Sequence, residues 1–286
     1  MDRLVDLHTH STASDGTCTP AEVVRLAHEA GLAAVALTDH DTVDGLAEAR
    51  AAAASLPLEF VPGIELAARN VPRTVDILGL WLPERPQRLQ QALSWLIERR
   101  DERNALMVEK LAALGLPVTL AEVMAAAGGT VGRPHIARLL VDKGCVGSMN
   151  EAFDRYIGRA GSAYVPKTSL AAEEAVELLK AEGATVILAH PAIYDLPVAE
   201  MESLVRRLAD RGLDGIEDIY SEHSANKVRE FTCLAERFGL AVSGGSDFHG
   251  ATKPSIRLGV GKGNLRVPRK VMDALKERRA RQDLPV

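Results

Sequence analysis

The sequence predicts an α/β fold in which repeated βα units form a barrel, interrupted by a helical insertion. Short apolar runs of strand length alternate with amphipathic stretches of helix length in the first and last parts of the chain. Histidines and acidic residues stand at or just beyond the ends of these runs, as they do at the rim of a parallel barrel. The chain has 286 residues, 47% of them hydrophobic, and can bury a core of this size.

The first part of the chain contains four expected strands and two expected helices. The strands are expected at residues 4–7, 33–38, 58–65 and 74–81. A helix is expected at residues 20–30, because Thr19 is a favourable N-cap and Pro20 suits the first helical position. An alanine-rich helix is expected at residues 42–54.

The same alternation resumes after residue 167. Strands are expected at residues 185–189, 215–219, 240–244 and near 257–260. Helices are expected at residues 199–209, 226–238 and 268–281. Repeated units of this kind build parallel sheets or barrels.

The middle of the chain has a different character. A long charged helix is expected at residues 87–114, followed by shorter helices at 120–127, 134–142 and 150–157, with no convincing strand. We therefore expect a barrel formed by residues 1–85 and 168–286. We expect residues 86–167 to form a helical insertion that acts as a substrate-binding cap.

Bulk composition excludes several classes of protein. A net charge of -5 argues against a duplex-DNA binder held by phosphate contacts. No apolar run approaches the roughly 18 residues of a membrane span, and the N-terminal residues lack a secretory signal pattern. The cysteines Cys18, Cys145 and Cys233 are far apart and read as reduced thiols. We expect a cytoplasmic protein.

The pair His8 and His10, which follows the first expected strand, is the strongest local signal. Two imidazoles that point into one space repel each other when protonated and compete for donors when neutral. A metal ion resolves both problems, because it takes neutral imidazole nitrogen as a ligand. The alternative is an ordinary pair of surface or core histidines, because this short motif has false matches.

Further polar residues cluster at the other expected strand ends. Six of the eight histidines stand at or just beyond such an end. We expect the metal ligands to be His8, His10, Asp15, His40, Glu65, Asp76, His190, Asp247 and His249. The carboxyl ends of barrel strands share one rim, so residues far apart in the sequence converge there.

The chemistry of this set indicates divalent ions. Imidazoles and carboxylates without a thiolate favour Mn²⁺, with Fe, Zn or Mg as alternatives. The ligands suffice for two or three ions, and Glu65 could bridge two of them. Clustered ions serve displacement at phosphorus, because they acidify a bridging water and neutralise phosphoryl oxygens. Hydrolysis of a phosphoester is therefore the leading chemistry.

Four other polar residues beside these ligands have open roles. Asp39 and Asp41 flank His40 and are expected to orient it or a nearby water, which gives Asp39 a catalytic role. His223 is a candidate general acid, with a capping or surface role as the alternative. Glu217 could coordinate metal or fix a neighbouring loop.

The insertion supplies candidate anion-binding residues. Residues 128–169 contain six basic and three acidic side chains, a local charge of +3 in a chain of net charge -5. Gly128, Gly129 and Gly132 lead into Arg133 and Pro134 at a helix start, where free backbone N–H groups and the helix dipole suit an anion. We expect Arg133, His135 and Lys167 to bind substrate phosphates. An ordinary loop with a surface arginine is the alternative.

Five motifs together resemble those of the PHP (polymerase and histidinol phosphatase) family of the amidohydrolase superfamily. They are DLHTHS at 6–11, TDHD at 38–41, PGIE at 62–65, LAHP at 188–191 and GSDFH at 245–249. The resemblance implies a distorted seven-stranded, TIM-like (βα)7 barrel with a multinuclear metal centre. The helical insertion with GRPH at 132–135 is similar to the branch that contains 3',5'-nucleotide bisphosphate phosphatase and the exoribonuclease RNase AM.

This resemblance implies a phosphatase that removes the 3'-phosphate of nucleoside 3',5'-bisphosphates such as adenosine 3',5'-bisphosphate. The alternatives are a 5'-to-3' exoribonuclease on short 5'-phosphorylated RNA, a histidinol phosphatase, and a non-catalytic metal-stabilised binding module. The partner would be a small nucleotide or short RNA, with no membrane and no duplex DNA. The chain departs from the family pattern at Asp76, where histidine is frequent, and we expect this to weaken a third ion site.

Overall fold

The computed structural model describes residues 3–127 and 132–285. The chain divides into two compact units. The first, which we call the barrel unit, consists of Met1–Gln90 and Leu170–Val286. The second, the helical unit, consists of Gln91–Ser169. Each unit is described separately.

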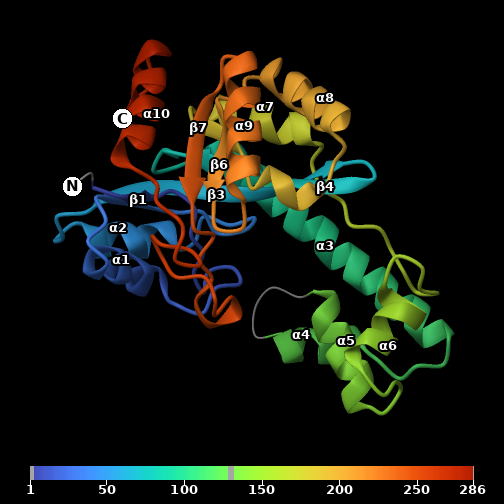
Figure 1. Ribbon diagram of the computed structural model, residues 1–286. Helices are drawn as coiled ribbons and strands as arrows, with labels where there is room; N and C mark the ends of the chain where they lie inside the picture. The colour runs from blue at the N-terminus through green and yellow to red at the C-terminus, as the bar shows by residue number, and fades with distance from the viewer. Residues whose placement is uncertain (1–2, 128–131, 286) are drawn as a thin grey trace. The chain divides into compact units, whose positions relative to one another are not determined.

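The barrel unit is built on a seven-stranded sheet whose spatial order follows the chain order, β1 to β7. Figure 1 labels β1, β3, β4, β6 and β7 of this sheet. The strands are β1 (Val5–Asp6), β2 (Ala34–Leu37), β3 (Glu59–Asn70), β4 (Arg73–Leu80), β5 (Thr185–Leu188), β6 (Gly215–Tyr220) and β7 (Ala241–Gly245). The N–H of Leu7 donates to the carbonyl of Gly244 at 3.2 Å, which links the two ends of the sheet. The predicted distorted seven-stranded barrel is confirmed.

One strand differs from the parallel arrangement that repeated βα units predict. β4 is antiparallel to both β3 and β5, whereas the other neighbouring pairs are parallel. Only Val71 and Pro72 separate β3 from β4, and so short a connection can join only antiparallel strands. β3 also runs on to Asn70, so Glu65 lies inside the strand and not at its end.

The antiparallel direction of β4 matters for the placement of polar residues. The beginning of β4 lies beside the ends of its neighbours, because the strand runs the opposite way. Asp76 pairs with Ala67 of β3, and its carbonyl accepts a hydrogen bond from the N–H of Ala189 at 3.0 Å. Asp76 is therefore adjacent to the segment that follows β5.

Six helices accompany the sheet in the part of the barrel unit that the structure describes. They are α1 (Pro20–Glu29), α2 (Leu46–Ala53), α7 (Ala172–Ala181), α8 (Val198–Ala209), α9 (Ala225–Arg237) and α10 (Arg269–Arg281), with short 3-10 turns at Pro191–Tyr194 and Gly250–Thr252. Thr19 caps α1 as predicted, in a reciprocal arrangement with Glu22. A large core cluster packs the sheet against α10. It includes Val5 of β1, Leu7 just after β1, and Met272 of α10.

Two local predictions for the barrel unit need correction. The strand expected near residues 257–260 does not form, and only a single bridge joins Arg257 to Gly261. Gly259 and Gly261 adopt φ values of 74° and 54°, which a strand does not accommodate. The helix α7 was missed, although Ala172, Ala175, Val176 and Leu179 are buried at helical spacing.

The helical unit contains most of α3 (Gln87–Ala113) together with α4 (Leu120–Ala127), α5 (Arg133–Asp142), α6 (Met149–Ala152) and a π-helical turn at Phe153–Ile157. Its own core includes Met107, Leu111, Val123, Ile136 and Leu140. No strand occurs in the part of this unit that the structure describes. It therefore has the packing of an independent small domain.

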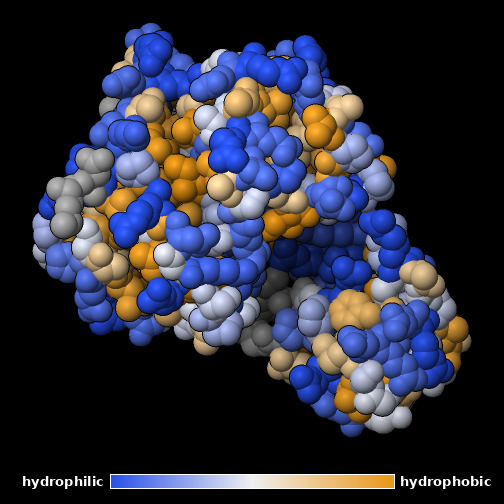
Figure 2. Space-filling view, viewed as in Figure 1, coloured by the Kyte–Doolittle hydropathy of each residue, from blue (hydrophilic) through white to orange (hydrophobic). Residues whose placement is uncertain are grey.

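Hydrophilic residues cover most of the face drawn in Figure 2, and hydrophobic residues lie between them in small groups. Among the described residues, no helix is both long enough and apolar enough to cross a bilayer.

Candidate metal centre

His8 and His10 lie in the extended segment that follows β1, and both are fully buried. Residues two positions apart in an extended chain point to the same side, so the two imidazoles face one space. Their Nε2 atoms are 3.1 Å apart. Two imidazole nitrogens this close need either a shared proton or a shared cation between them.

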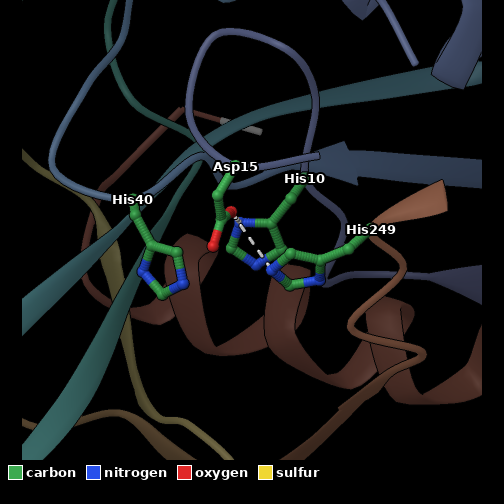
Figure 3. A group of neighbouring side chains, drawn as sticks. All are labelled: His10, Asp15, His40 and His249. Atoms are coloured by element: carbon green, nitrogen blue, oxygen red, sulfur yellow. Dashed lines mark ion pairs between the residues drawn. The ribbon is translucent and has the colours of Figure 1, made fainter. Parts of the chain in front are cut away.

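Four side chains from three different loops form one candidate cation site (Figure 3). His10 and Asp15 follow β1, His40 follows β2, and His249 follows β7. Each offers a ligand atom, and these atoms lie within 4.8 Å of one another. Asp15 Oδ1 lies 3.2 Å from His249 Nε2, and the rings of His10 and His249 stack at 4.0 Å.

Glu65 occupies the centre of the cluster. Its Oε2 atom lies 3.3 Å from His8 Nε2, 3.2 Å from His10 Nε2 and 3.1 Å from His40 Nδ1. This oxygen is buried and makes no hydrogen bond of good geometry with any described residue. One carboxylate oxygen surrounded by three imidazole nitrogens is a set of donor atoms that suits a divalent cation.

Two further groups of candidate ligands include Glu65. One contains His8, His10 and Glu65, and the other contains His40, Glu65 and Asp76. His190 extends the second group, because its Nε2 lies 2.9 Å from Glu65 Oε1 and 4.0 Å from Asp76 Oδ2. Burial and the negative charge of Glu65 raise the pKa of Asp76 to about 7. A cation bound here would relieve this crowding of negative charge.

Asp247, which follows β7, lies next to His8 and His10 of these groups. Its Oδ1 lies 3.3 Å from His10 Nε2, while its Oδ2 accepts hydrogen bonds from Tyr220 Oη at 2.9 Å and Lys253 Nζ at 2.6 Å. Burial alone would raise the pKa of Asp247, but His10 and the neighbouring His8 hold it well below its usual range. Asp247 therefore presents a charged oxygen to the cluster.

Backbone strain is concentrated at the same rim. Asp41, His190 and Asp247 have φ values of 52°, 25° and 57°, in the left-handed region that non-glycine residues rarely occupy. Such strain persists only where the surrounding structure fixes it, and it is typical of functional sites.

The sequence left open whether Glu217 coordinates metal or fixes a neighbouring loop, and its contacts now show where it acts. Its carboxylate lies 3.1 Å from His8 Nδ1 and accepts a hydrogen bond from the N–H of His190 at 2.8 Å. It thus fixes the proton of His8 on Nδ1 and leaves Nε2 facing Glu65. This is the usual way in which an outer carboxylate orients a metal-binding histidine.

Asp6 is a positioning residue that the sequence analysis missed. Its carboxylate accepts hydrogen bonds from the N–H groups of Ser246 at 2.8 Å and Gly259 at 2.7 Å. These bonds attach β1 to the segment that carries Asp247 and His249. An acidic residue inside a buried apolar strand was the available signal.

Asp39 is buried, and its two oxygens serve the loop after β1. They accept hydrogen bonds from the N–H and Oγ of Ser11, both at 2.7 Å, and from Ser14 Oγ at 2.6 Å. Asp41 holds β3 instead, through the N–H of Ala67 at 3.2 Å. Asp39 therefore contacts the loop that bears His10 and Asp15.

His223 is buried next to β6. Its Nδ1 donates to the carbonyl of Asp218 at 2.8 Å, and its ring contacts the ring of Tyr220 edge-on at 5.1 Å. Nε2 is buried and has no hydrogen-bond partner among the described residues. Burial lowers the pKa of His223, so the imidazole is an acceptor at Nε2 in its neutral form.

The candidate phosphate contacts belong to the helical unit. Arg133 begins α5 and lies over the ring of Phe153, with its Cζ 5.7 Å from the ring centre. His135 Nδ1 accepts a hydrogen bond from the N–H of Gly132 at 3.0 Å, which caps α5 and leaves Nε2 available. Lys167 is exposed. The rest of the expected glycine loop, residues 128–131, lies outside the described residues.

The barrel site fits divalent cations. Three of its buried atoms, His10 Nδ1, Glu65 Oε2 and His190 Nδ1, have no hydrogen-bond partner among the described residues. Buried polar atoms are otherwise almost always paired. The donors are imidazole nitrogens and carboxylate oxygens, which suit Mn, Fe or Zn. The barrel unit thus contains a cluster of histidine and carboxylate side chains that could hold a metal ion.

Comparisons with known proteins agree with this chemistry. Residues 6–107 match the model of the PHP domain. The chain is 36% identical to a 3',5'-nucleoside bisphosphate phosphatase of Chromobacterium violaceum over 86% of this chain and 87% of that protein. It is 34% identical to the 5'-3' exoribonuclease Rnm of Escherichia coli over 90% and 88% of the two chains. A solved amidohydrolase from Chromobacterium violaceum superimposes with a TM-score of 0.74 at 34% identity, with 96% of each chain covered.

Proposed function

This chain belongs to the PHP domain family, and on that premise we propose that it is a metal-dependent phosphatase acting on nucleoside 3',5'-bisphosphates. It removes the 3'-phosphate and yields the 5'-nucleotide and inorganic phosphate. The observation that carries this proposal is the single oxygen of Glu65 that faces three imidazole nitrogens. A relative of known name with the same activity covers most of the chain.

Nine residues of the barrel unit are proposed to hold two or three divalent ions, with Mn²⁺ as the favoured metal. They are His8, His10, Asp15, His40, Glu65, Asp76, His190, Asp247 and His249. When bound, such ions lower the pKa of water and neutralise the charge of a phosphoryl group. The chain itself supplies the orientation, because Glu217 fixes the tautomer of His8 and Tyr220 fixes Asp247.

The leaving 3'-oxygen needs a proton, and His223 is the proposed donor. Its Nδ1 is held by the carbonyl of Asp218, so only Nε2 can deliver a proton. Because burial lowers the pKa of His223, its protonated form is a stronger acid than an ordinary imidazolium, but most His223 side chains are neutral at neutral pH and must first take up a proton at Nε2. Asp39 acts on the reaction indirectly in this scheme, by holding the loop that bears His10 and Asp15.

Substrate phosphates are proposed to bind Arg133, His135 and Lys167. Arginine suits this task because its planar guanidinium donates two parallel hydrogen bonds to a phosphate. His135 has its Nδ1 engaged with Gly132, so its Nε2 is the atom that can contact a ligand.

Phosphate release tests the proposal directly. With Mn²⁺, the protein is expected to convert adenosine 3',5'-bisphosphate to 5'-AMP and one phosphate, and to leave 5'-AMP largely intact. Chelation should abolish the activity and renewed Mn²⁺ should restore it. Equal rates on the bisphosphate and on 5'-AMP, or full activity after chelation, would contradict the proposal.

A second candidate is 5'-to-3' trimming of short RNA by the same site. The observation that favours it is the 34% identity to the exoribonuclease Rnm over nearly the whole chain. Release of nucleotides in sequence from the 5' end of a 5'-phosphorylated oligoribonucleotide would establish it. An oligonucleotide with a 5'-hydroxyl end is the matched control.

A further inference from the structure

A tyrosine hydroxyl takes the place of a backbone hydrogen bond where β4 pairs with β5. The register of these antiparallel strands puts Asp76 opposite Ala189, one position beyond the pair of Ile77 and Leu188. In a hydrogen-bonded antiparallel pair, each residue donates its N–H to the carbonyl of the other. The N–H of Ala189 does donate to the carbonyl of Asp76, at 3.0 Å. The reciprocal bond runs through the side chain of Tyr194 instead.

Tyr194 ends the 3-10 turn that follows His190, and its side chain is buried. The N–H of Asp76 donates to Tyr194 Oη at 2.8 Å, and this Oη donates to the carbonyl of Ala189 at 2.8 Å. A direct bond would bring the nitrogen of Asp76 and the oxygen of Ala189 to about 2.9 Å. Two bonds in series hold these two atoms farther apart, so the hydroxyl of Tyr194 acts as a spacer between the strands.

This spacer lies directly beside two candidate metal ligands. Asp76 is one of them, and the carbonyl of Ala189 belongs to the peptide that leads into His190, the other. The N–H of the same peptide donates to Glu217 at 2.8 Å. Because a peptide is planar, its orientation is fixed when Tyr194 holds the C=O and Glu217 holds the N–H. His190 has a φ of 25°, a strained value that persists only with such support.

Backbone pairing alone does not require a hydroxyl at this position, because a direct bond would satisfy both backbone groups. The spacer matters for the side chains on either side of it. Asp76 Oδ2 lies 4.0 Å from His190 Nε2, which lies 2.9 Å from Glu65 Oε1. Ligand atoms about 2.1 Å from one ion stand roughly 3 to 4 Å apart, depending on the angle between them. The separation of Asp76 and His190 therefore suits a shared ion, and it depends on how far apart β4 and β5 are held.

We propose that Tyr194 is a positioning residue whose hydroxyl sets the distance between Asp76 and His190. The ion that these two ligands share with Glu65 then depends on Tyr194 for its affinity, and the presence of that ion rests on the proposed function. Within the described residues, Tyr194 makes no hydrogen bond or ring contact with the four side chains of Figure 3. An ion held by those four side chains should therefore not depend on Tyr194.

Titration of the chelated protein with Mn²⁺, followed by calorimetry, tests this role without reference to activity. Tyr194→Phe keeps the ring and removes only the hydroxyl. We expect one ion to bind about 10- to 100-fold more weakly and the remaining ions to bind as in the wild type, as loss of an outer contact to a metal ligand would do. Tyr156→Phe, at a half-buried tyrosine of the helical unit, is the matched control and should change nothing. Unchanged binding of every ion in Tyr194→Phe would overturn the proposal.

A double-variant comparison shows which ion Tyr194 serves. Asp76→Ala should weaken the same ion, and adding Tyr194→Phe to it should weaken that ion no further, because the hydroxyl acts through Asp76 and His190. Independent, additive losses would contradict this. Anomalous scattering from crystals grown with Mn²⁺ should show a peak between Asp76 and His190 in the wild type and a weaker one in Tyr194→Phe. A wild-type protein without that peak would also overturn the proposal.

Thermal melting distinguishes this role from a purely structural one. Without metal, Tyr194→Phe should melt close to the wild type, because the N–H of Asp76 and the carbonyl of Ala189 can then bond directly. Mn²⁺ should raise the melting temperature of the variant less than that of the wild type. A large fall in the melting temperature of the metal-free variant, with every ion weakened alike, would show that Tyr194 serves only the fold.

The same measurements separate this inference from the proposed function. If Tyr194→Phe weakens one Mn²⁺ ion but the wild-type protein does not hydrolyse adenosine 3',5'-bisphosphate, the inference stands and the proposed function fails. If the wild-type protein hydrolyses the bisphosphate and Tyr194→Phe binds every ion as the wild type does, the proposed function stands and the inference fails.

Discussion

At the scale of single residues, the metal centre depends on carboxylates that do different work. Glu65 faces three imidazoles with one oxygen, whereas Glu217 lies behind His8 and fixes its proton. Both residues are glutamates and both are completely buried, so neither residue type nor burial distinguishes their roles. Their separate roles follow from which nitrogen of each histidine they contact. In the proposed metal site, Glu217 would act through His8, the histidine that it orients.

Replacing Glu217 with glutamine should therefore weaken metal binding without removing a ligand. The amide cannot hold the proton on His8 Nδ1 as strongly, and it offers a poorer acceptor to the N–H of His190. We expect metal affinity to fall by about 10- to 100-fold, measured by titration of the chelated protein with Mn²⁺. Glu222→Gln, which removes an exposed carboxylate paired with Lys262, is the control. Unchanged affinity in Glu217→Gln would show that the bond to His8 is not functional.

At the scale of elements, the strand β4 explains why Asp76 belongs to the site. In a wholly parallel barrel, a residue near the start of a strand would lie at the opposite end from the ligands. Because β4 is antiparallel, its start lies beside His190. The loops after β1, β2 and β7 bring the remaining ligands to the same rim.

The sequence predicted that the candidate ligands converge at one rim, but it did not predict how β3 and β4 are connected. His8, His10 and His249 follow apolar runs, so their common location follows from the rule that active sites lie at strand ends. The β3–β4 hairpin was not recognised as antiparallel, although the few residues between the two strands leave no room for a crossover helix. The roles of Glu217 and Asp39 depend on side-chain contacts between distant segments, which periodicity and spacing do not contain.

Asp39 provides a test of how one loop supports the centre. It holds the loop after β1 through Ser11 and Ser14, so Asp39→Asn should loosen His10 and Asp15. We expect weaker Mn²⁺ binding together with a kcat that recovers at saturating Mn²⁺. Asp44→Asn, an exposed residue of the loop after β2, is the control. A fall in kcat that excess metal does not correct would assign Asp39 to the chemistry itself.

At the scale of the whole molecule, the two units carry different candidate residues. All nine candidate metal ligands belong to the barrel unit, and the candidate phosphate contacts Arg133, His135 and Lys167 belong to the helical unit. The C-terminal part of the chain helps to hold the barrel unit together through Asp214. Asp214, just before β6, accepts hydrogen bonds from Lys180 of α7 at 2.8 Å and from Gln282, just after α10, at 2.8 Å.

The stability of the barrel unit should therefore depend on pH through Asp214. Burial alone would raise the pKa of this carboxyl, but Lys180, Gln282 and the N–H of Val186 lower it below its ordinary value of 3.8. A carboxyl with a lowered pKa stabilises the folded state above its ordinary pKa, and this contribution is lost as the pH falls through the lowered value.

Asp214→Asn should accordingly destabilise the protein at neutral pH by about 1 to 3 kcal/mol, because it removes a charged acceptor from buried hydrogen bonds. Thermal melting of both proteins from pH 7 down to pH 3 measures the effect. The difference in melting temperature should be constant above about pH 5 and should shrink as the pH falls below the ordinary pKa of 3.8, because the unfolded chain then takes up a proton that the folded carboxyl resists. Asp210→Asn, an exposed acid four residues earlier, should show no such difference. A difference between Asp214→Asn and wild type that stays constant down to pH 3 would mean that the charge of Asp214 contributes nothing and that only its shape matters.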